Sequence, residues 1–544
     1  MMHSGYQFSS TDRTDLESRG IDLKEALRQL DLLDGRANSA KLLRACRPPG
    51  DGVRLLDPDR QQRLEETWER EASRLRVMKF VPASGAATRM FSFLSKAEQD
   101  ADGGERAQLE EAAARGSAAA RQALQLAAQF GRLPFADEIV KLATERGIEP
   151  SRLEQHPLAL GEIIAGPAGL ALAALPKALI PFHAYGTKQR SAFEEHLYEA
   201  AQYCRGRNGV SVHFTVTPEH LEQFEQAARR ARSRARESTG ADFEIEFSVQ
   251  DPSTDTLAIL ESTAGGLELL RSETGRLLFR PSGHGALITN LGRLDADVVF
   301  VKNIDNVAPQ RRHRISAAWK KRLGGLLLRL RKQGFELLDR LEALDDCASS
   351  AGSAALRDAL WFCRENLALR LPASAQGIPP ETVRSFLIDR LDRPLRVCGV
   401  VRNVGEPGGG PFWVQHESGE LGFTLRESGQ IVESNQVDST SPSQRAIFLG
   451  ASHFNPVDLV CAPRDRRGHR YELTRFVDPN TSFVARKEHA GRSIRVLERP
   501  GLWNGAMAGW NTAFVEVPLE TFTPVKTILD LTRGDHQARP DSAA

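Results

Sequence analysis

The chain has 544 residues, of which 41% are hydrophobic and 26% charged, and its formal net charge is +1. Such values are typical of a globular protein with about two to four domains or one large elaborated domain. A net charge so close to zero gives no support to a general nucleic-acid-binding role. The six cysteines form no Cys-x-x-Cys pair, which argues against a zinc site and favours buried thiols in a reducing compartment.

The apolar residues do not form a stretch of the roughly 20 that a bilayer span requires. The first residues of the chain are polar and lack the apolar core of a signal peptide. We therefore expect a soluble, cytoplasmic protein without a membrane or nucleic-acid partner. The oligomeric state is left open by the sequence.

The first predicted segment, residues 1–76, is an N-terminal helical cap, because Leu23, Leu27 and Leu30 recur at helical spacing. A buried strand is then predicted at 77–81, followed by small residues and a helix from Thr88. Residues 103–128 are rich in Ala, Glu, Arg and Gln, which predicts a solvated helix or a mobile hairpin outside the core.

Strands and helices alternate further along the chain. Helices are predicted over 187–204 and after Thr217, and strands over 210–216, 244–249 and 298–301. Such alternation is typical of a sheet covered by helices, with mostly parallel strands. We interpret residues 77–310 as a nucleotide-binding α/β half.

A long amphipathic helix is predicted over 314–344, inside a helical insertion that spans 311–394. A second α/β half, 395–533, should complete the site. Residues 534–544 are predicted to be a disordered tail. Within the second half, strands are predicted at 396–401, 446–449 and 512–517.

The first motif that could bind a ligand follows the strand at 77–81. Ala83, Ser84, Gly85 and Ala86 are small enough to let backbone N–H groups approach a phosphate, and the helix that follows adds positive potential. Arg89 could supply a charged contact. The loop is neither a Walker A motif nor a dinucleotide fingerprint, and an ordinary strand–helix turn accounts for it equally well.

Two further motifs supply candidate ligand contacts. Lys177 lies between two prolines, Pro176 and Pro181, where a stiff loop could hold it as a fixed counter-charge for a phosphate. The alternative is a lysine that merely reaches solvent. Gly283, His284 and Gly285 precede a predicted helix and would allow close backbone approach to a flat or anionic ligand; a plain turn is the alternative.

The fourth motif is the segment 302–306, Lys-Asn-Ile-Asp-Asn, at the end of the strand 298–301. Chemistry in α/β enzymes lies at strand ends, and a carboxylate that binds Mg²⁺ together with substrate phosphates is the usual protein site for that ion. Asp305 is the candidate ligand. An Asp/Asn-rich turn with local hydrogen bonds is the alternative.

These motifs, in this order, resemble those of the sugar-phosphate nucleotidyltransferases, in particular the UDP-sugar pyrophosphorylases. Residues 84–90 are similar to the Gly-Gly-x-Gly-Thr-Arg-Met-like loop of that class, 176–177 to its Pro-Lys element, 282–285 to its Pro-Gly-His-Gly-like loop, and Asp305 to its strand-end aspartate. The whole chain also resembles the bacterial DUF4301 family, which brings no activity with it. The segments that carry this second resemblance are 177–183, 283–287, 302–306, 405–413, 453–459 and 502–510.

The nucleotidyltransferase resemblance implies a GT-A-like, Rossmann-related α/β fold with a mixed, mostly parallel central sheet. It implies a Mg²⁺-dependent enzyme that joins a nucleoside triphosphate, such as UTP, to a sugar-1-phosphate or a similar phosphorylated molecule. By this resemblance Arg89, Lys177 and Asp305 are catalytic, and Asp305 binds the metal. Gln250 and the loop 283–285 would contact base or ribose.

Departures from the family pattern leave alternatives open. Ser84 and Ala87 replace two glycines, and an added Cβ can obstruct a phosphate cradle. A non-catalytic nucleotide or nucleotide-sugar binding protein is therefore the second hypothesis, and a GT-A-like glycosyltransferase is the third. The second half should supply the acceptor side. Glu406 could contact sugar hydroxyls from a glycine-rich loop, for which a flexible hairpin is the alternative. Asn455 is a candidate substrate contact, and Asp458 or Asn455 could complete the Mg²⁺ site; a structural turn is the alternative there.

Overall fold

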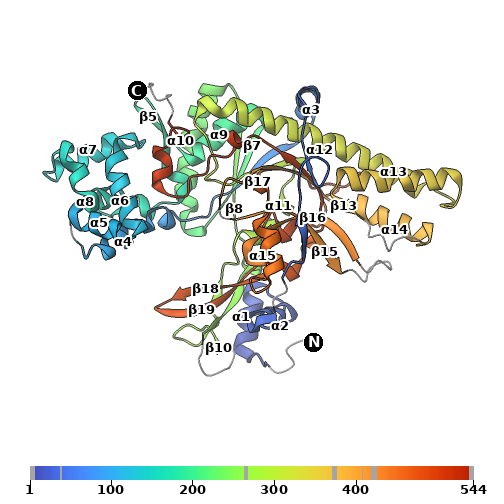
Figure 1. The fold of residues 1–544 in the computed structure, drawn as a ribbon, viewed down its shortest axis with the longest axis horizontal. Coiled ribbons are helices and arrows are strands. Elements are labelled where there is room, and N and C mark those ends of the chain that lie inside the picture. The colour runs from blue at the N-terminus through green and yellow to red at the C-terminus, as the bar shows by residue number, and fades with distance from the viewer. Residues whose placement is uncertain are drawn as a thin grey trace. The chain divides into compact units, whose positions relative to one another are not determined.

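The computed structural model describes residues 6–36, 39–103, 105–261, 268–370, 377–406, 408–417 and 425–537 (Figure 1). The chain divides into two compact units. Unit 1 comprises residues 1–77, 248–301 and 320–519, and unit 2 comprises 78–247, 302–319 and 520–544. Each unit is thus assembled from three separate stretches of the chain. The predicted division into five consecutive segments stays a prediction.

The apolar stretches in the sequence of unit 2 form buried strands. β3 (Val77–Pro82) pairs in parallel with β7 (Gly209–Val216), while β6 (Arg205–Gly206) pairs with β7 antiparallel and β8 (Phe243–Val249) also pairs with β7. Nearly every residue of β3 and β7 is buried, which fits their continuous Val- and Phe-rich sequences. A separate hairpin joins β4 (Pro181–Tyr185) to β5 (Lys188–Ser191).

Two helices of unit 2 have clear sequence signals. α9 (Ala192–Tyr203) begins at a capping box in which Ser191 and Glu194 satisfy each other's backbone N–H groups. The helix predicted from 187 therefore starts later, because residues 188–191 form β5. α10 (Leu221–Thr239) ends at Gly240, whose φ of 65° is left-handed.

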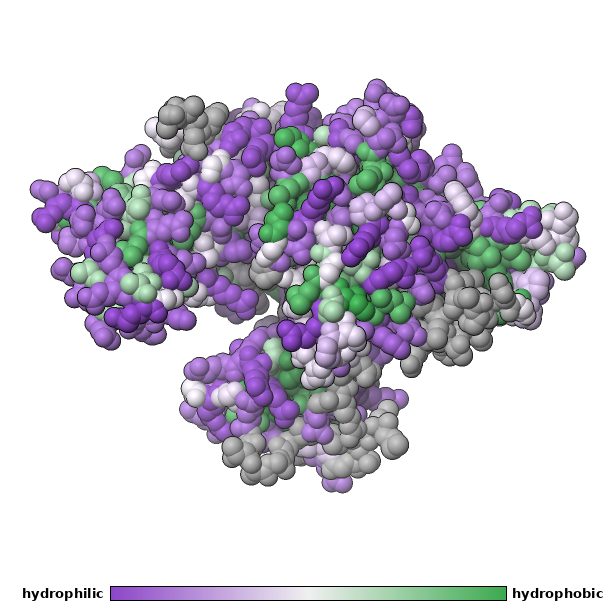
Figure 2. Space-filling view, viewed as in Figure 1, coloured by the Kyte–Doolittle hydropathy of each residue, from purple (hydrophilic) through white to green (hydrophobic). Residues whose placement is uncertain are grey.

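The remaining helices of unit 2 form one cluster (Figure 1). Residues 103–128, for which a solvated helix or mobile hairpin was predicted, form α5 and α6, and Ala119, Ala120 and Ala123 are buried. The surface of this cluster is mainly hydrophilic (Figure 2). Its helices are α4 (Thr88–Asp100), α5 (Arg106–Ala114), α6 (Ala118–Gln129), α7 (Ala136–Glu145) and α8 (Pro157–Ala165).

The largest sheet portion of unit 1 mixes both strand directions. β14 (Leu395–Arg402) pairs in parallel with β20 (Asn511–Glu516) and antiparallel with β17 (His453–Ala462). β2 (Val53–Arg54) extends this sheet beside β20, and β12 (Val298–Val301) extends it beside β17. The predicted α/β class with a mixed sheet is confirmed.

Unit 1 also contains two smaller antiparallel sheets. One has the order β1-β15-β16-β13, and the other has β10-β9-β19-β18, with β11 also paired to β9. The predicted N-terminal helices are α1 (Ser10–Arg19) and α2 (Leu23–Asp31); their Leu16, Ala26 and Leu30 pack in one apolar cluster with Leu257 and Ile259 of β9. The strands are β1 (Leu42–Ala45), β9 (Thr256–Leu260), β10 (Glu268–Leu269), β11 (Phe279–Arg280), β13 (Leu369–Arg370), β15 (Gly409–Glu417), β16 (Leu425–Glu433), β18 (Phe483–His489) and β19 (Arg492–Glu498).

The helices of the second half of the chain follow the predicted pattern with one exception. α12 (His313–Glu342) matches the long amphipathic helix, and its residues from Lys320 onward belong to unit 1. The strand predicted at 446–449 is wrong, because these residues end α15 (Pro442–Leu449), whose start is capped by Ser441. The other helices of unit 1 are α3 (Pro58–Glu71), α11 (Ile288–Arg293), α13 (Ser350–Asn366) and α14 (Pro380–Leu391).

Within the described residues, no helix combines the length and the apolar character that crossing a bilayer requires. The predicted tail also differs in part. Residues 534–537 lie in the described region, and His536 is buried, whereas 538–544 lie outside the described residues.

Glycine permits the close packing of α3 on α12. A Cβ on Gly325 would lie 1.9 Å from the carbonyl oxygen of Leu64, so we expect Gly325→Ala to destabilise the protein by about 2 kcal/mol through overpacking. Gly334 of the same helix is the matched control, since its Cβ would meet only the Phe362 ring at 3.7 Å. Gly334→Ala should be neutral or stabilising by up to about 1 kcal/mol through helix propensity. Urea unfolding measures both, and equal effects would contradict this packing.

Candidate functional site

The small-residue loop of unit 2 leaves a helix start without a capping side chain. β3 ends at Pro82, and Ala83 then donates its N–H to the carbonyl of Thr215 at 2.9 Å. Ser84, Gly85 and Ala86 are exposed, and no side chain caps the N-terminus of α4. A Cβ on Gly85 would meet no atom within 4 Å. Packing therefore does not require this glycine, and space is available beside its backbone for a ligand.

The Pro-Lys motif lies directly against this loop, although about 90 residues separate the two in sequence. Lys177 donates its N–H to the carbonyl of Gly85 at 3.2 Å, and Ala86 forms a β-bridge with Pro176. Ala87 donates its N–H to the carbonyl of Leu175 at 3.3 Å. The backbone thus brings together two motifs that the sequence singles out separately.

Asp305 lies between two lysines at the same place. Its Oδ2 is 2.9 Å from Lys177 Nζ and 3.0 Å from Lys526 Nζ. The segment that contains Lys526 is held here by backbone contacts: Val525 donates to the Asp305 carbonyl at 3.0 Å, and Thr523 donates to Asn306 Oδ1 at 2.9 Å. Two ammonium groups thus meet one carboxylate beside the loop 83–87, and the charge of Asp530 also acts on Lys177.

The charges of this trio influence one another. Burial alone would raise the pKa of the Asp305 carboxyl, but the charges of Lys177 and Lys526 hold that pKa below its ordinary value. Burial lowers the pKa of Lys177 more than Asp305 raises it. Lys526 is 59% exposed. Arg89 is exposed on the first turn of α4, and no carboxylate pairs with it among the described residues.

A second charged group fixes the strands beneath the loop. Glu199 of α9 accepts from Lys79 Nζ and from Lys302 Nζ, each at 2.6 Å, and from the Ser316 hydroxyl at 2.9 Å. The side chains of Lys79, Glu199 and Lys302 are at most 2% exposed. This cluster joins β3, α9 and the segment that begins with Lys302, so it holds the three segments in register.

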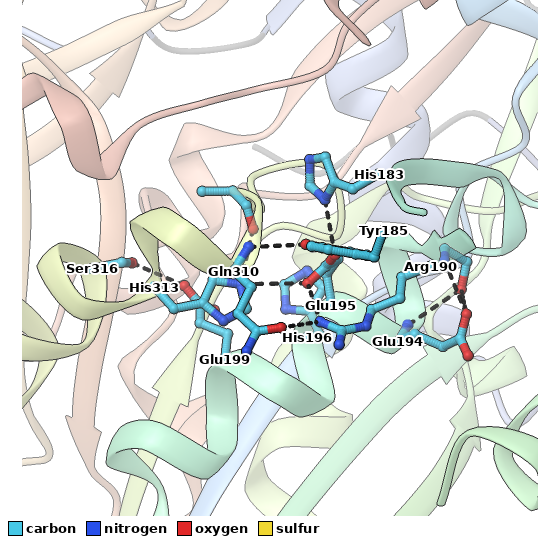
Figure 3. A network of polar contacts seen from close by, with 12 residues as sticks. His183, Tyr185, Arg190, Glu194, Glu195, His196, Glu199, Gln310, His313 and Ser316 are labelled. Atoms are coloured by element: carbon cyan, nitrogen blue, oxygen red, sulfur yellow. Dashed lines mark hydrogen bonds and ion pairs between the residues drawn. The ribbon is translucent and has the colours of Figure 1, made fainter. Parts of the chain in front are cut away.

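A buried histidine network holds the C-terminal segment against the rest of unit 2. His183 and Tyr185 of β4 point toward Glu195 (Figure 3), with His183 Nδ1 at 3.0 Å and the tyrosine hydroxyl at 2.6 Å from Glu195 Oε1. His313 Nε2 lies 3.4 Å from the other carboxylate oxygen. The second ring nitrogen of His183, Nε2, is 3.1 Å from Nδ1 of His536. His536 therefore ties to the core the segment that also supplies Lys526.

Sequence reasoning missed Lys526, Glu195 and His536. None of these three lies in a motif, and His536 falls in the predicted tail. His313 belongs to the basic run 311–314, for which a solvated turn is favoured over a phosphate contact. Burial raises the pKa of Glu195, but hydrogen bonds and charge from His183 and His313 reverse the effect and hold that pKa well below its usual range.

The His536 contact predicts a pH dependence of stability. Burial, and then the charge of His183, lower the pKa of His536 well below 6.5 in the folded state. The unfolded chain therefore binds a proton below about pH 6.5 that the folded chain does not, so stability falls as the pH drops through that value, by up to about 1.4 kcal/mol per pH unit. His536→Gln should reduce this dependence, measured as the change in melting temperature between pH 7.5 and 5.0.

The control variant replaces a histidine that lies outside this network. His469 is 75% exposed, and His469→Gln should keep the wild-type pH dependence. An unchanged pH dependence in His536→Gln would contradict the role assigned to the buried ring.

The predicted ligand contacts near Gln250 and Gly283 belong to unit 1. Gln250 donates to Asp255 Oδ1 at 3.1 Å. A Cβ on Gly285 would lie 1.9 Å from the carbonyl oxygen of Pro500, so packing demands this glycine. His284 Nδ1 accepts from the Leu502 N–H at 2.9 Å, its ring stacks on Trp503, and burial lowers its pKa to about 4.

The other candidates of the second half also lie in unit 1. Asp458 is buried and forms an ion pair with Lys320, also buried, at 3.0 Å. Glu406 and Asn455 are half-buried. The described residues contain no group of three or more His, Cys, Asp or Glu side chains that could hold a metal ion. The ligand roles of these residues, and of Gln250, Gly283 and His284, stay predictions.

A domain of unknown function, DUF4301, matches residues 9–537. The chain belongs to the DUF4301 family. No curated protein matches this DUF4301 chain.

Solved structures similar to the DUF4301 chain include two mutants of the UDP-glucose pyrophosphorylase from Leishmania major. The first, in complex with UDP-glucose, is 17% identical with a TM-score of 0.33, and the match covers 66% of this chain and 62% of that one. The second is 14% identical with a TM-score of 0.34, and the match covers 65% and 61%. The chain thus spans about three fifths of the length of these structures, and a likeness at this level carries no argument about what it binds.

Proposed function

We propose that the protein is a nucleotidyltransferase that acts on a phosphorylated small molecule and binds phosphates beside Asp305. The observation that carries this proposal is the convergence in unit 2 of three separate motifs: the loop 83–87, Pro176-Lys177 and Asp305. A convergence of small-residue backbone, a helix start and two lysines suits a polyphosphate. On this proposal the α/β fold is of the GT-A-like kind.

Phosphate binding would be divided among these groups. The exposed backbone at Ser84, Gly85 and Ala86 and the uncapped start of α4 would face phosphate oxygens, with Arg89 as a further cation. Lys177 and Lys526 would transfer part of their interaction from Asp305 to the phosphates. Their ammonium groups already lie within 3.0 Å of the Asp305 carboxylate, so little reorganisation is needed.

The fit of Mg²⁺ follows from the charges around Asp305. Asp305 is already paired with two lysines, so its carboxylate alone offers poor resident binding for a divalent cation. Mg²⁺ is usually held by one or two carboxylates together with substrate phosphates and water. Asp305 would fit that role once Lys177 and Lys526 transfer part of their interaction to the triphosphate. When bound, the ion would neutralise charge on the phosphates and help orient them.

The proposed reaction is an in-line displacement at the α-phosphorus of a nucleoside triphosphate. An oxygen of a sugar-1-phosphate forms the new P–O bond, the bond to the β-phosphate breaks, and pyrophosphate leaves with the electron pair. A phosphate oxygen needs no proton removed at neutral pH, so the protein contributes positioning and positive charge. Lys177 and Lys526 are the residues placed to stabilise the added negative charge.

A second candidate function is nucleotide or nucleotide-sugar binding without turnover. The observation in its favour is Ala87, which replaces a family glycine, is fully buried, and has its N–H engaged by Leu175. That amide is therefore not free for a phosphate. This candidate predicts that nucleotide raises the melting temperature while no pyrophosphate is released.

Substitution of Asp305 tests the proposal. With Mg²⁺, nucleoside triphosphates and sugar phosphates, we expect Asp305→Asn to abolish pyrophosphate release, and Lys177→Gln to lower it by about 10²–10³-fold, because charge stabilisation in the transition state is lost. Lys188→Gln, an exposed lysine of the same unit, is the charge control and should retain full activity. Melting curves verify folding. Normal turnover in a folded Asp305→Asn protein would overturn the proposal. Release of nucleoside diphosphate from an added nucleotide-sugar, in place of pyrophosphate release, would indicate a glycosyltransferase.

A further inference from the structure

α3 packs against α12 in unit 1, and charged side chains along the two helices face one another. Gly325 of α12 lies against the backbone of Leu64, and Gly324 lies against Trp68. The helices run in opposite directions, because higher numbers on α12 face lower numbers on α3. A residue one turn further along α12 therefore faces a residue one turn earlier on α3.

Charges are matched at one end of this helix pair. Lys321 Nζ lies 2.7 Å from Glu69 Oε1, and Arg322 Nε lies 3.1 Å from Glu65 Oε2. Arg322 also donates to Gln61 Oε1 at 2.8 Å. These contacts are the ordinary way to satisfy cations along a helix interface.

The matching fails at the other end. Arg329 follows Gly325 by one turn, and Arg60 precedes Leu64 by one turn, so arginine faces arginine. Arg63 belongs to the same face of α3 as Arg60. Among the described residues, no carboxylate forms an ion pair with Arg60, Arg63 or Arg329, although the structure pairs many surface arginines elsewhere.

Burial makes this arrangement costly. The Nε atoms of Arg60 and Arg329 are both buried and have no hydrogen-bond partner in the described region. A buried donor without a partner is destabilising and rare in native structures. Arg54 of β2 adds a fourth guanidinium, which donates to Asn366 Oδ1 at 3.2 Å and to the Glu365 carbonyl.

The neighbouring positive charges lower the pKa values of two of these arginines, Arg54 and Arg329. Burial, followed by the charges of Arg60 and Arg329, lowers the pKa of Arg54 to about 10. Burial, followed by the charges of Arg60 and Arg63, lowers the pKa of Arg329. Arg60 therefore acts on both Arg54 and Arg329, and Arg63 acts on Arg329, whereas Glu365 raises the pKa of Arg54.

We propose that Arg54, Arg60, Arg63 and Arg329 form a binding site for a phosphate-class anion, separate from the site around Asp305. Guanidinium groups bind phosphate oxygens in a bidentate manner and stay charged at all relevant pH values. An oxyanion among them would supply both the missing negative charge and acceptors for unpaired N–H groups. A small phosphorylated metabolite or inorganic pyrophosphate has the required chemistry.

Calorimetry with sodium pyrophosphate at constant ionic strength and without Mg²⁺ tests this site. The titration is done in the Lys177→Gln background to weaken binding beside Asp305, and the Arg329 and Arg322 variants are compared with this parent protein. We expect one binding event that Arg329→Gln weakens about tenfold or more, because a charge-assisted contact is removed. Sodium phosphate and ATP in parallel titrations distinguish a free phosphate from a larger phosphorylated ligand.

Arg322→Gln in the same background is the matched control. It removes one positive charge from the same helix pair, but that charge is already paired with Glu65. Its pyrophosphate affinity should stay within about twofold of the parent protein. Equal affinities in Arg329→Gln and the parent protein, or no binding of any of the three anions, would overturn the proposal. If Arg329→Gln does not fold, the exposed Arg63 replaces it as Arg63→Gln.

Discussion

The buried Glu199 carboxylate is the constraint on which the architecture of unit 2 depends. It neutralises Lys79 of β3 and Lys302 of the segment after β12, each at 2.6 Å. Loss of one partner from a buried ion pair leaves an uncompensated charge and costs about 3–5 kcal/mol. The loop 83–87 and Asp305 lie only a few residues beyond these lysines, so the same interaction determines where both are placed.

Pairs of lysines on one carboxylate recur in unit 2. Lys79 and Lys302 meet Glu199, and Lys177 and Lys526 meet Asp305. On the proposed function, the second pair lies beside the exposed backbone of the loop 83–87, where cations attract an anionic ligand.

The part of the candidate site that could be predicted from the sequence has local sequence signals. The strand at β3, its small-residue loop, Pro176-Lys177 and Asp305 each have a signal within about ten residues. Lys526 and His536 have none, because their roles arise only when the C-terminal segment packs on unit 2. The strand predicted at 446–449 was wrong because so short an apolar run fits a strand and a helix equally well. The signal that decides for a helix is Ser441-Pro442 at the start of α15.

Hydrogen exchange with and without Mg²⁺ and a nucleoside triphosphate tests most directly whether the separate segments form one site. We predict joint protection of backbone amides in 84–90, 177–180, 303–306 and 523–527, at one common ligand concentration. Amides of β14 in unit 1 should be unaffected and serve as the internal control. Protection of only one of the four segments, or of none at saturating nucleotide, would contradict the account.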